Sequence, residues 1–175
     1  MTMTVWDAVH DKRAVRHFAD RPLEPDHLHR ILEAGRRAHS AKNDQAWGFI
    51  AVRDKDRLRE MSKLGPWTDH VEGAAVAIAL VTPDPHADGA PLSLTWDLGG
   101  AAAQMMLVGW ELGVGSCPAT VYEHDRAREI LGYPGDMHCE YILSFGYPAN
   151  PAILTRPNKP GGRRPFEEIV HEERW

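Results

Sequence analysis

Three separated groups of polar side chains in this sequence have the chemistry to bind a flat, anionic ligand. The first group is Lys12, Arg13 and Arg16, which ends the first predicted helix. Arginines at three-residue spacing can converge on one anion, and each guanidinium offers a fork of donors that matches phosphate oxygens. Cations are also favourable at the negative end of a helix. This group alone therefore fits either a phosphate site or a solvated basic helix end.

The second group is Ser40, Asn43 and Gln45, between a predicted helix and a predicted strand. If the chain is extended here, Asn43 and Gln45 point the same way, and each amide carries both donors and an acceptor. Such side chains suit the mixed donor and acceptor edge of a heterocycle. A polar helix-to-strand loop, with Ser40 or Asn43 near the helix end, is the competing interpretation.

The third group is a glycine-containing segment, Gly113-Val114-Gly115, followed by Ser116, Cys117, Pro118, Ala119 and Thr120. The glycines permit tight turning and close approach of a ligand to the backbone. Pro118 stands where a dinucleotide fingerprint needs its third glycine, and the sequence has no Walker-type phosphate loop. The segment therefore argues against a Rossmann or P-loop site.

Histidine and cysteine spacing predicts neither a metal site nor a side-chain nucleophile. His27 and His29 face different sides of a predicted helix, and no His-x-x-x-His pair is present. The sequence places no histidine or aspartate beside Cys117, so a buried structural role is expected for it. Only two cysteines occur, Cys117 and Cys139, which fits a reducing cytoplasm better than a disulfide framework.

Composition describes one ordinary globular domain. The chain has 175 residues, 43% hydrophobic and 26% charged, and a net charge of -5. This acidity gives no general attraction to nucleic acid. No signal peptide is expected at the start of the sequence. The apolar stretch 94–112 contains Asp97, Gln104 and Glu111, and it is predicted to be a buried central helix rather than a membrane span.

Periodicity and helix-breaking residues predict an irregular alternation of helices and strands, typical of an α+β layered fold. Helices are expected at residues 5–13, 25–38, 55–64, 94–112 and 125–131, and interior strands at 46–52, 74–81 and 139–145. The segment 147–165 holds five prolines and two adjacent glycines, so it is expected to extend over a surface. Such a tail would wrap a second subunit, or it would be disordered without one.

In order along the chain, these motifs resemble the nitroreductase family. The N-terminal signature is matched by Lys12-Arg13-Ala14-Val15-Arg16-His17-Phe18, Leu23-Glu24-Pro25, Ile31-Leu32-Glu33-Ala34 and Ser40-x-x-Asn43-x-Gln45-x-Trp47-x-Phe49-Ile50. Gly113-x-Gly115-Ser116-Cys117 resembles its later loop, and Arg163-Arg164-Pro165-Phe166-Glu167-Glu168-Ile169-Val170 resembles its C-terminal signature. Each motif is unspecific alone, whereas the ordered set is specific.

The resemblance implies a nitroreductase-like α+β fold with a central mixed or antiparallel sheet, in which two chains intertwine and bind FMN at their interface. The whole chain would be one domain, and residues 147–175 would wrap the partner subunit. The FMN-binding residues carried over from the motifs are Lys12, Arg13, Ala14, Arg16, Ser40, Asn43, Gln45, Pro118, Ala119, Thr120 and Arg163. The flavin would carry the redox chemistry, so no side chain is expected to act as a catalytic acid or base.

The implied activity is transfer of hydride from NADH or NADPH through FMN to a nitroaromatic, quinone or other conjugated acceptor in a cytoplasmic homodimer. Alternatives on the same scaffold are substrate dehydrogenation, dehalogenation, flavin breakdown and non-catalytic flavin binding. The sequence departs from the family pattern at Ala14, where a serine hydroxyl is usual, and at Lys12, where arginine is common. It is also shorter than typical members, which leaves the shape of the acceptor pocket open.

Overall fold

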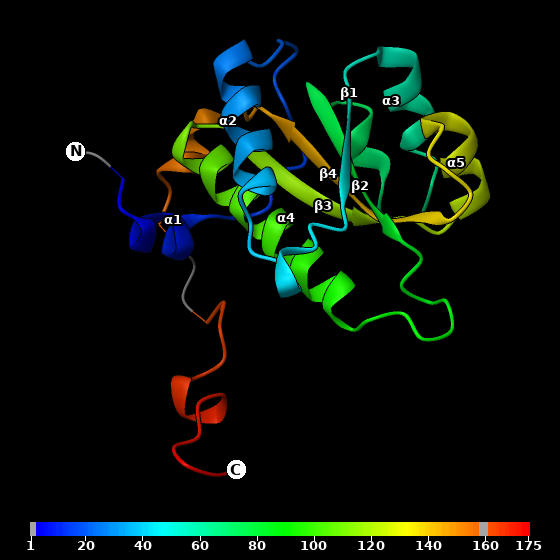
Figure 1. Ribbon diagram of the computed structural model, residues 1–175. Coiled ribbons are helices and arrows are strands. Elements are labelled where there is room, and N and C mark those ends of the chain that lie inside the picture. The colour runs from blue at the N-terminus through cyan, green and yellow to red at the C-terminus, as the bar shows by residue number, and fades with distance from the viewer. Residues whose placement is uncertain (1–2, 158–160) are drawn as a thin grey trace.

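A four-stranded antiparallel sheet forms the centre of the molecule (Figure 1). The computed structural model describes residues 3–157 and 161–175. The strands are β1 (Gly48–Val52), β2 (Val76–Pro83), β3 (Gly115–Thr120) and β4 (Met137–Gly146), in the order β1-β2-β4-β3. β2 and β4 are the inner pair and are apolar almost throughout, as strands covered on both faces must be.

One face of the sheet is covered by α2 (Pro25–Arg36) and α4 (Ser93–Glu111). Pro25 occupies the first turn of α2, where its missing N–H costs nothing. Gly35 of α2 packs closely against Met105 of α4. Ile78, Leu80, Leu143 and Phe145 of the sheet complete this core with both helices. α4 therefore packs against both the sheet and α2 in this core.

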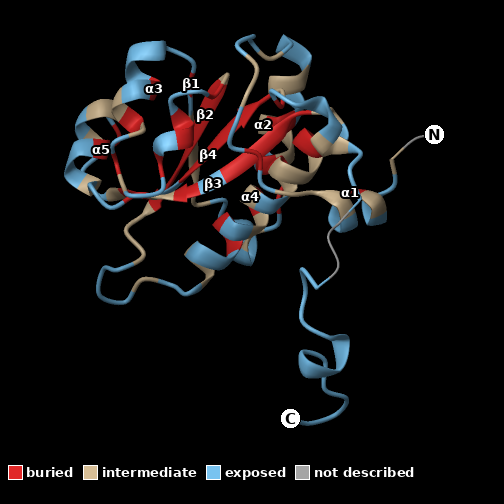
Figure 2. Cartoon of the chain, turned by 180° about the vertical axis from the view of Figure 1, so that it is seen from behind, coloured by how far each residue is buried: buried red, intermediate tan, exposed pale blue. Residues whose placement is uncertain are grey.

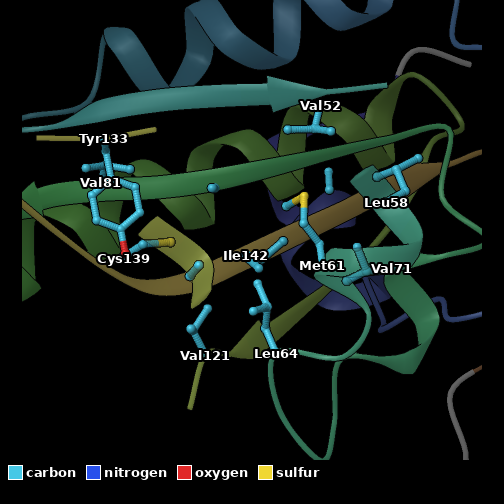
Figure 3. Close-up of a cluster of buried hydrophobic side chains, with 13 residues drawn as sticks. Val52, Leu58, Met61, Leu64, Val71, Val81, Val121, Tyr133, Cys139 and Ile142 are labelled. Atoms are coloured by element: carbon cyan, nitrogen blue, oxygen red, sulfur yellow. The ribbon is translucent and has the colours of Figure 1, made fainter. Parts of the chain in front are cut away.

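The opposite face carries a second core beneath α3 (Lys55–Met61), η2 (Asp69–Val71) and α5 (His124–Leu131). Figure 3 shows the side chains of Leu58, Met61 and Leu64 beside Val71 and Ile142 in this cluster. All five are fully or almost fully buried. The sheet thus lies between two helical layers, each with its own apolar core.

The N-terminal helix α1 (Val5–Asp11) lies beside α4 and begins with a capping box between Thr4 and Asp7. Its contact with the body is small: Ala8 and Val15 form a third cluster with Trp110 of α4. Val5, Trp6 and Val9 remain exposed, so one side of α1 is left uncovered by the residues that the structure describes.

The C-terminal segment leaves the body after η3 (Pro151–Leu154) (Figures 1 and 2). Residues 161–175 are all exposed and include one short helical turn, η4 (Phe166–Glu168). Phe166 is 71% exposed and Trp175 is 98% exposed. This segment has no core of its own.

The structure confirms the predicted α+β class with an antiparallel central sheet, and every predicted helix and interior strand is present within a few residues of its expected ends. Two local expectations were wrong. Residues 115–120 form a strand rather than a loop, because they pair with β4 along their whole length. The helix α4 is buried on one side only. The segment at 40–45 is a tight turn, which agrees with the interpretation as a polar helix-to-strand loop and not with extended chain.

None of the helices in the described ranges is long and apolar enough to cross a membrane.

Candidate flavin site

The basic segment that follows α1 lies against the free edge of β3. Ala14 forms a parallel bridge with Ser116, and the Val15 N–H donates to the Ser116 carbonyl oxygen at 2.9 Å. The approach is close because Gly115 has no side chain: a Cβ there would lie 2.6 Å from the Cβ of Val15. The fold therefore brings together the first and third groups of residues predicted from the sequence.

The cations of this segment have no acidic partner. Lys12 places its Nζ 3.4 Å from the Met106 sulfur of α4, and burial lowers the pKa of its amine. The Arg13 guanidinium lies 5.9 Å from the ring centre of Trp110, and Arg16 is exposed. No ion pair to these three cations occurs anywhere in residues 3–157 or 161–175. An anionic group would satisfy charge that the chain itself leaves uncompensated.

A hollow of about 380 Å³ lies beside Arg16. Ala14 and Arg16 form one wall, and Asn150 and Ile153 of the segment after β4 form the other. Ala14 is exposed here, so the usual family serine would have presented its hydroxyl to this hollow. The hollow is large enough for a phosphate group beside Arg16.

The exposed part of β3 is Pro118, which has no N–H and is tolerated because β3 is an edge strand. Pro118 lines an apolar cavity of about 190 Å³ between the sheet and α4, together with Gly99, Met106 and Tyr141. Ala119 is buried on the other face and Thr120 is half-buried. Of these three predicted FMN-binding residues, Pro118 is thus the one that presents its side chain to an open surface beside α4.

The turn that carries Ser40, Asn43 and Gln45 has a strained backbone. Lys42, Asn43 and Gln45 all have positive φ, at 52°, 62° and 49°, a conformation that non-glycine residues adopt rarely and at a cost of about 1–3 kcal/mol each. The Ser40 hydroxyl accepts from the Gln45 N–H at 3.0 Å. The Gln45 side chain donates to the Asn43 carbonyl oxygen at 3.3 Å.

A residue that the sequence reasoning missed anchors this turn. Asp97 is 8% exposed, and its carboxylate accepts from the Ala41 N–H at 2.9 Å. In the sequence Asp97 served only as an argument against a membrane span. Its burial in an otherwise apolar helix was the available signal, because a buried carboxylate needs a donor.

Within one chain the turn and the basic segment are far apart. Asp97 holds the turn near the start of α4, whereas Lys12 contacts Met106 nine residues later, about 14 Å along the helix. Arg163 belongs to the exposed C-terminal segment 161–175, which points away from the sheet and its helices (Figure 1). The predicted site residues therefore form separate sets in a single chain.

The surroundings of Cys117 differ from the sequence expectation. His70 and Ser144 lie beneath β3: His70 Nδ1 is 2.8 Å from Ser144 Oγ, which donates to the Cys117 carbonyl oxygen at 3.2 Å. The thiol is nevertheless buried, and burial raises its pKa even with Arg16 and Lys12 nearby. A structural role for Cys117 agrees with this environment.

Comparison with known proteins identifies the family that this arrangement belongs to. The Nitroreductase family model matches residues 9–68 and 65–147. A protein of Archaeoglobus fulgidus, provisionally named NADH dehydrogenase/NAD(P)H nitroreductase, is 30% identical over 95% of this chain and 96% of its own length. The chain belongs to the nitroreductase family. Membership confirms the predicted enzyme class, an FMN-dependent oxidoreductase of the nitroreductase type.

Other relatives agree along nearly the whole chain. The NADH dehydrogenase of Thermus thermophilus is 26% identical, with 91% of each chain covered. The structure of an FMN-dependent nitroreductase from Clostridium difficile R20291 superimposes with a TM-score of 0.81 at 25% identity, covering 96% of this chain and 98% of the other. The shortness of this nitroreductase-family chain is therefore shared with at least some of its relatives.

Proposed function

We propose that two copies of this chain form a homodimer that binds FMN at their interface, takes hydride from NADH or NADPH and reduces a nitroaromatic, quinone or other conjugated acceptor. The observation that carries the proposal is a set of three cations, Lys12, Arg13 and Arg16, that form no ion pair within residues 3–157 and 161–175 and lie beside the edge of β3 that exposes Pro118. A phosphate requires fixed positive charge, and a flavin ring requires an apolar surface beside backbone polar groups.

Different residues of the chain suit the two ends of FMN, its phosphate and its ring. Arg16 and the hollow beside Ala14 suit the phosphate, with Arg163 as a further cation from the C-terminal segment. Lys12 and Arg13, which are partly buried over α4, suit the polar edge of the ring. Along β3, Pro118 would contact the ring with its side chain, and Ala119 and Thr120 would contribute through the backbone of the strand. Bound there, FMN supplies hydride transfer, and the side chains position it.

The separation of the predicted residues supports a site built from two chains. Ser40, Asn43 and Gln45 lie about 14 Å along α4 from the basic segment of their own chain. The apolar cavity of about 190 Å³ beside Pro118 is also smaller than the roughly 300–1,000 Å³ of ordinary cofactor sites. A second copy packed along the open side of α4 would add its own turn and enlarge the enclosed volume.

The direct test is the absorbance spectrum of the purified protein before and after addition of NADH or NADPH. We expect a yellow flavoprotein whose visible band is bleached under anaerobic conditions by at least one nucleotide and restored by a nitroaromatic or a quinone. A colourless protein that cannot be reconstituted with FMN would overturn the proposal. If the protein binds flavin but neither NADH nor NADPH reduces it, these nucleotides are not the hydride donors and that part of the proposal is wrong.

The phosphate assignment is tested separately with Arg16→Ala. A hydrogen bond to a charged group contributes about 1.5–3 kcal/mol, so we expect FMN affinity to fall by roughly 10- to 100-fold. Arg53→Ala is the matched control, because Arg53 is an exposed arginine just after β1 and outside the site. Equal affinities in both variants would contradict the assignment.

A further inference from the structure

Two histidines and a glutamate that are far apart in the sequence meet at one end of the sheet. His86 comes from the loop after β2, and His138 and Glu140 come from β4. One ligand-type atom from each of the three lies within 4.8 Å of the others. The sequence did not predict this group because His86 and His138 are separated by 52 positions and match no ligand spacing.

A bulge in the sheet directs Glu140 toward His138. Leu80 pairs with Tyr141 and Val81 with Cys139, so Glu140 is the extra residue between two pairs. Its carboxylate Oε2 lies 2.8 Å from His138 Nε2 and 3.5 Å from His86 Nε2. Bulges are known to re-aim side chains in this way. The carboxylate is thus within reach of both imidazole rings, at a point where the sheet is irregular.

The group has the burial and polarity of a formed site rather than of scattered surface charges. His138 is only 8% exposed, and His124 of α5 packs its ring 4.4 Å from the His138 ring. The buried His124 Nδ1 has no hydrogen-bond partner among the described residues. His86 is exposed and leaves a route from solvent. Three imidazoles and one carboxylate thus lie close together at this end of the sheet.

We propose that His86, His138 and Glu140 bind one divalent transition-metal cation of the Zn²⁺ type. Imidazole nitrogen and carboxylate oxygen are the ligands that such ions take, and tetrahedral ligands at their usual bond lengths of about 2.0–2.2 Å stand about 3.4 Å apart. The 2.8 and 3.5 Å separations of Glu140 from the two histidines lie on either side of that spacing. His86 is already near that spacing, and the His138–Glu140 pair would open by about 0.6 Å to admit the ion.

The bound cation would fasten a loop to the wall of the cavity beside Pro118. His86 belongs to the exposed loop between β2 and α4, and both Pro85 of that loop and Glu140 line the cavity. Metal binding would therefore join the loop to β4 and fix this wall. The site is separate from the proposed flavin contacts, so its test does not depend on them.

The test is calorimetric titration of the purified protein, without a histidine tag, with Zn²⁺, and absorption spectroscopy with Co²⁺. We expect one equivalent per chain, visible Co²⁺ bands, and slower hydrogen exchange in residues 84–90. His86→Ala and Glu140→Gln should each weaken binding by more than the roughly 10–100-fold typical of losing an outer-shell partner. His86 is exposed, so its replacement leaves the fold intact.

His29→Ala is the matched control, since His29 is an exposed histidine on α2 outside the group. It should leave affinity and stoichiometry unchanged. The proposal is overturned if the wild-type chain binds neither ion, if His86→Ala binds as tightly as the wild type, or if binding occurs only with two chains bridged, as light scattering would reveal. In each of those cases the group is a hydrogen-bonded cluster that needs no metal within the chain.

Discussion

The N–H of Val15 donates to the carbonyl oxygen of Ser116 at 2.9 Å, and this contact attaches the basic segment to the sheet. The contact depends on the missing side chain of Gly115. A Cβ there would lie 2.6, 2.7 and 2.8 Å from three side-chain atoms of Val15, which is itself buried and stiff. The position of the cations therefore depends on a glycine that touches no ligand.

Gly115→Ala is expected to push the basic segment away from β3. Overpacking of this kind costs about 1–3 kcal/mol, and it should weaken FMN binding because Lys12 and Arg16 move with Val15. The measurements are urea unfolding and flavin titration of the same protein. Gly48→Ala is the control: it also lies in a strand, but an added Cβ meets nothing within 4 Å. Similar losses in both variants would refute the argument.

The fold could be predicted from the sequence largely because its inner strands and central helix have strong patterns. β2 is an almost continuous apolar run, β4 holds the apolar stretch Tyr141–Leu143, and the stretch 94–112 is too long and apolar to be anything but a helix. β3 could not be predicted, since its sequence Gly-Ser-Cys-Pro-Ala-Thr has little strand propensity. It is a strand because β4 offers it a full set of backbone partners.

The candidate site was predictable as residue types but not as an arrangement. The cations and amides could be chosen for their chemistry, whereas the positive φ values of Lys42, Asn43 and Gln45 follow from the anchoring of the turn on α4. Likewise, the approach of His86 to Glu140 depends on a bulge and a loop path that no local pattern encodes. Long-range contacts determine both the conformation of the turn and the approach of His86 to Glu140.

Asp97 is expected to hold the strained turn in place. Asp97→Ala removes the acceptor for the Ala41 N–H, a bond to a charged group that contributes about 1.5–3 kcal/mol. Hydrogen exchange in residues 41–47 should quicken by roughly 10- to 100-fold, and FMN affinity should fall if the turn contacts the flavin.

Asp97→Asn is the conservative comparison, because its amide oxygen can still accept from Ala41. This variant should keep most of the wild-type protection from hydrogen exchange, although it lacks the negative charge. Unchanged exchange in Asp97→Ala would show that the turn keeps its conformation without this contact.

Stability above neutral pH should depend on the buried thiol of Cys139. Burial raises its pKa from 9.0 to about 12. Between these two values the unfolded chain has lost the proton that the folded chain keeps, so the free energy of unfolding falls as pH rises. The contribution is fully present below pH 9 and is lost progressively up to pH 12.

The effect is isolated by comparison with Cys139→Ala. At pH 10, one unit above the unfolded pKa, the free energy of unfolding of the wild type should exceed that of the variant by about 1.4 kcal/mol less than it does at pH 8. Urea unfolding of both proteins with excess FMN measures it. The packing lost in Cys139→Ala lowers the free energy of unfolding equally at both pH values. Cys117 titrates in both proteins, so it also cancels in the comparison. A difference that does not change with pH would show that Cys139 does not titrate in this way.

The C-terminal segment is expected to stabilise an association of two chains rather than the chain itself. Residues 161–175 are all exposed, yet they include Phe166, Ile169, Val170 and Trp175. Burying a side chain of this size is worth about 1.5–3 kcal/mol, which the isolated chain does not gain.

Removal of residues 161–175 should therefore leave the helical content unchanged while raising the dimer dissociation constant by at least 10-fold. Light scattering across a dilution series measures this, with Glu167→Gln in the full-length chain as the control. A truncated protein that dimerises as tightly as the full-length one would show that the segment does not wrap its partner.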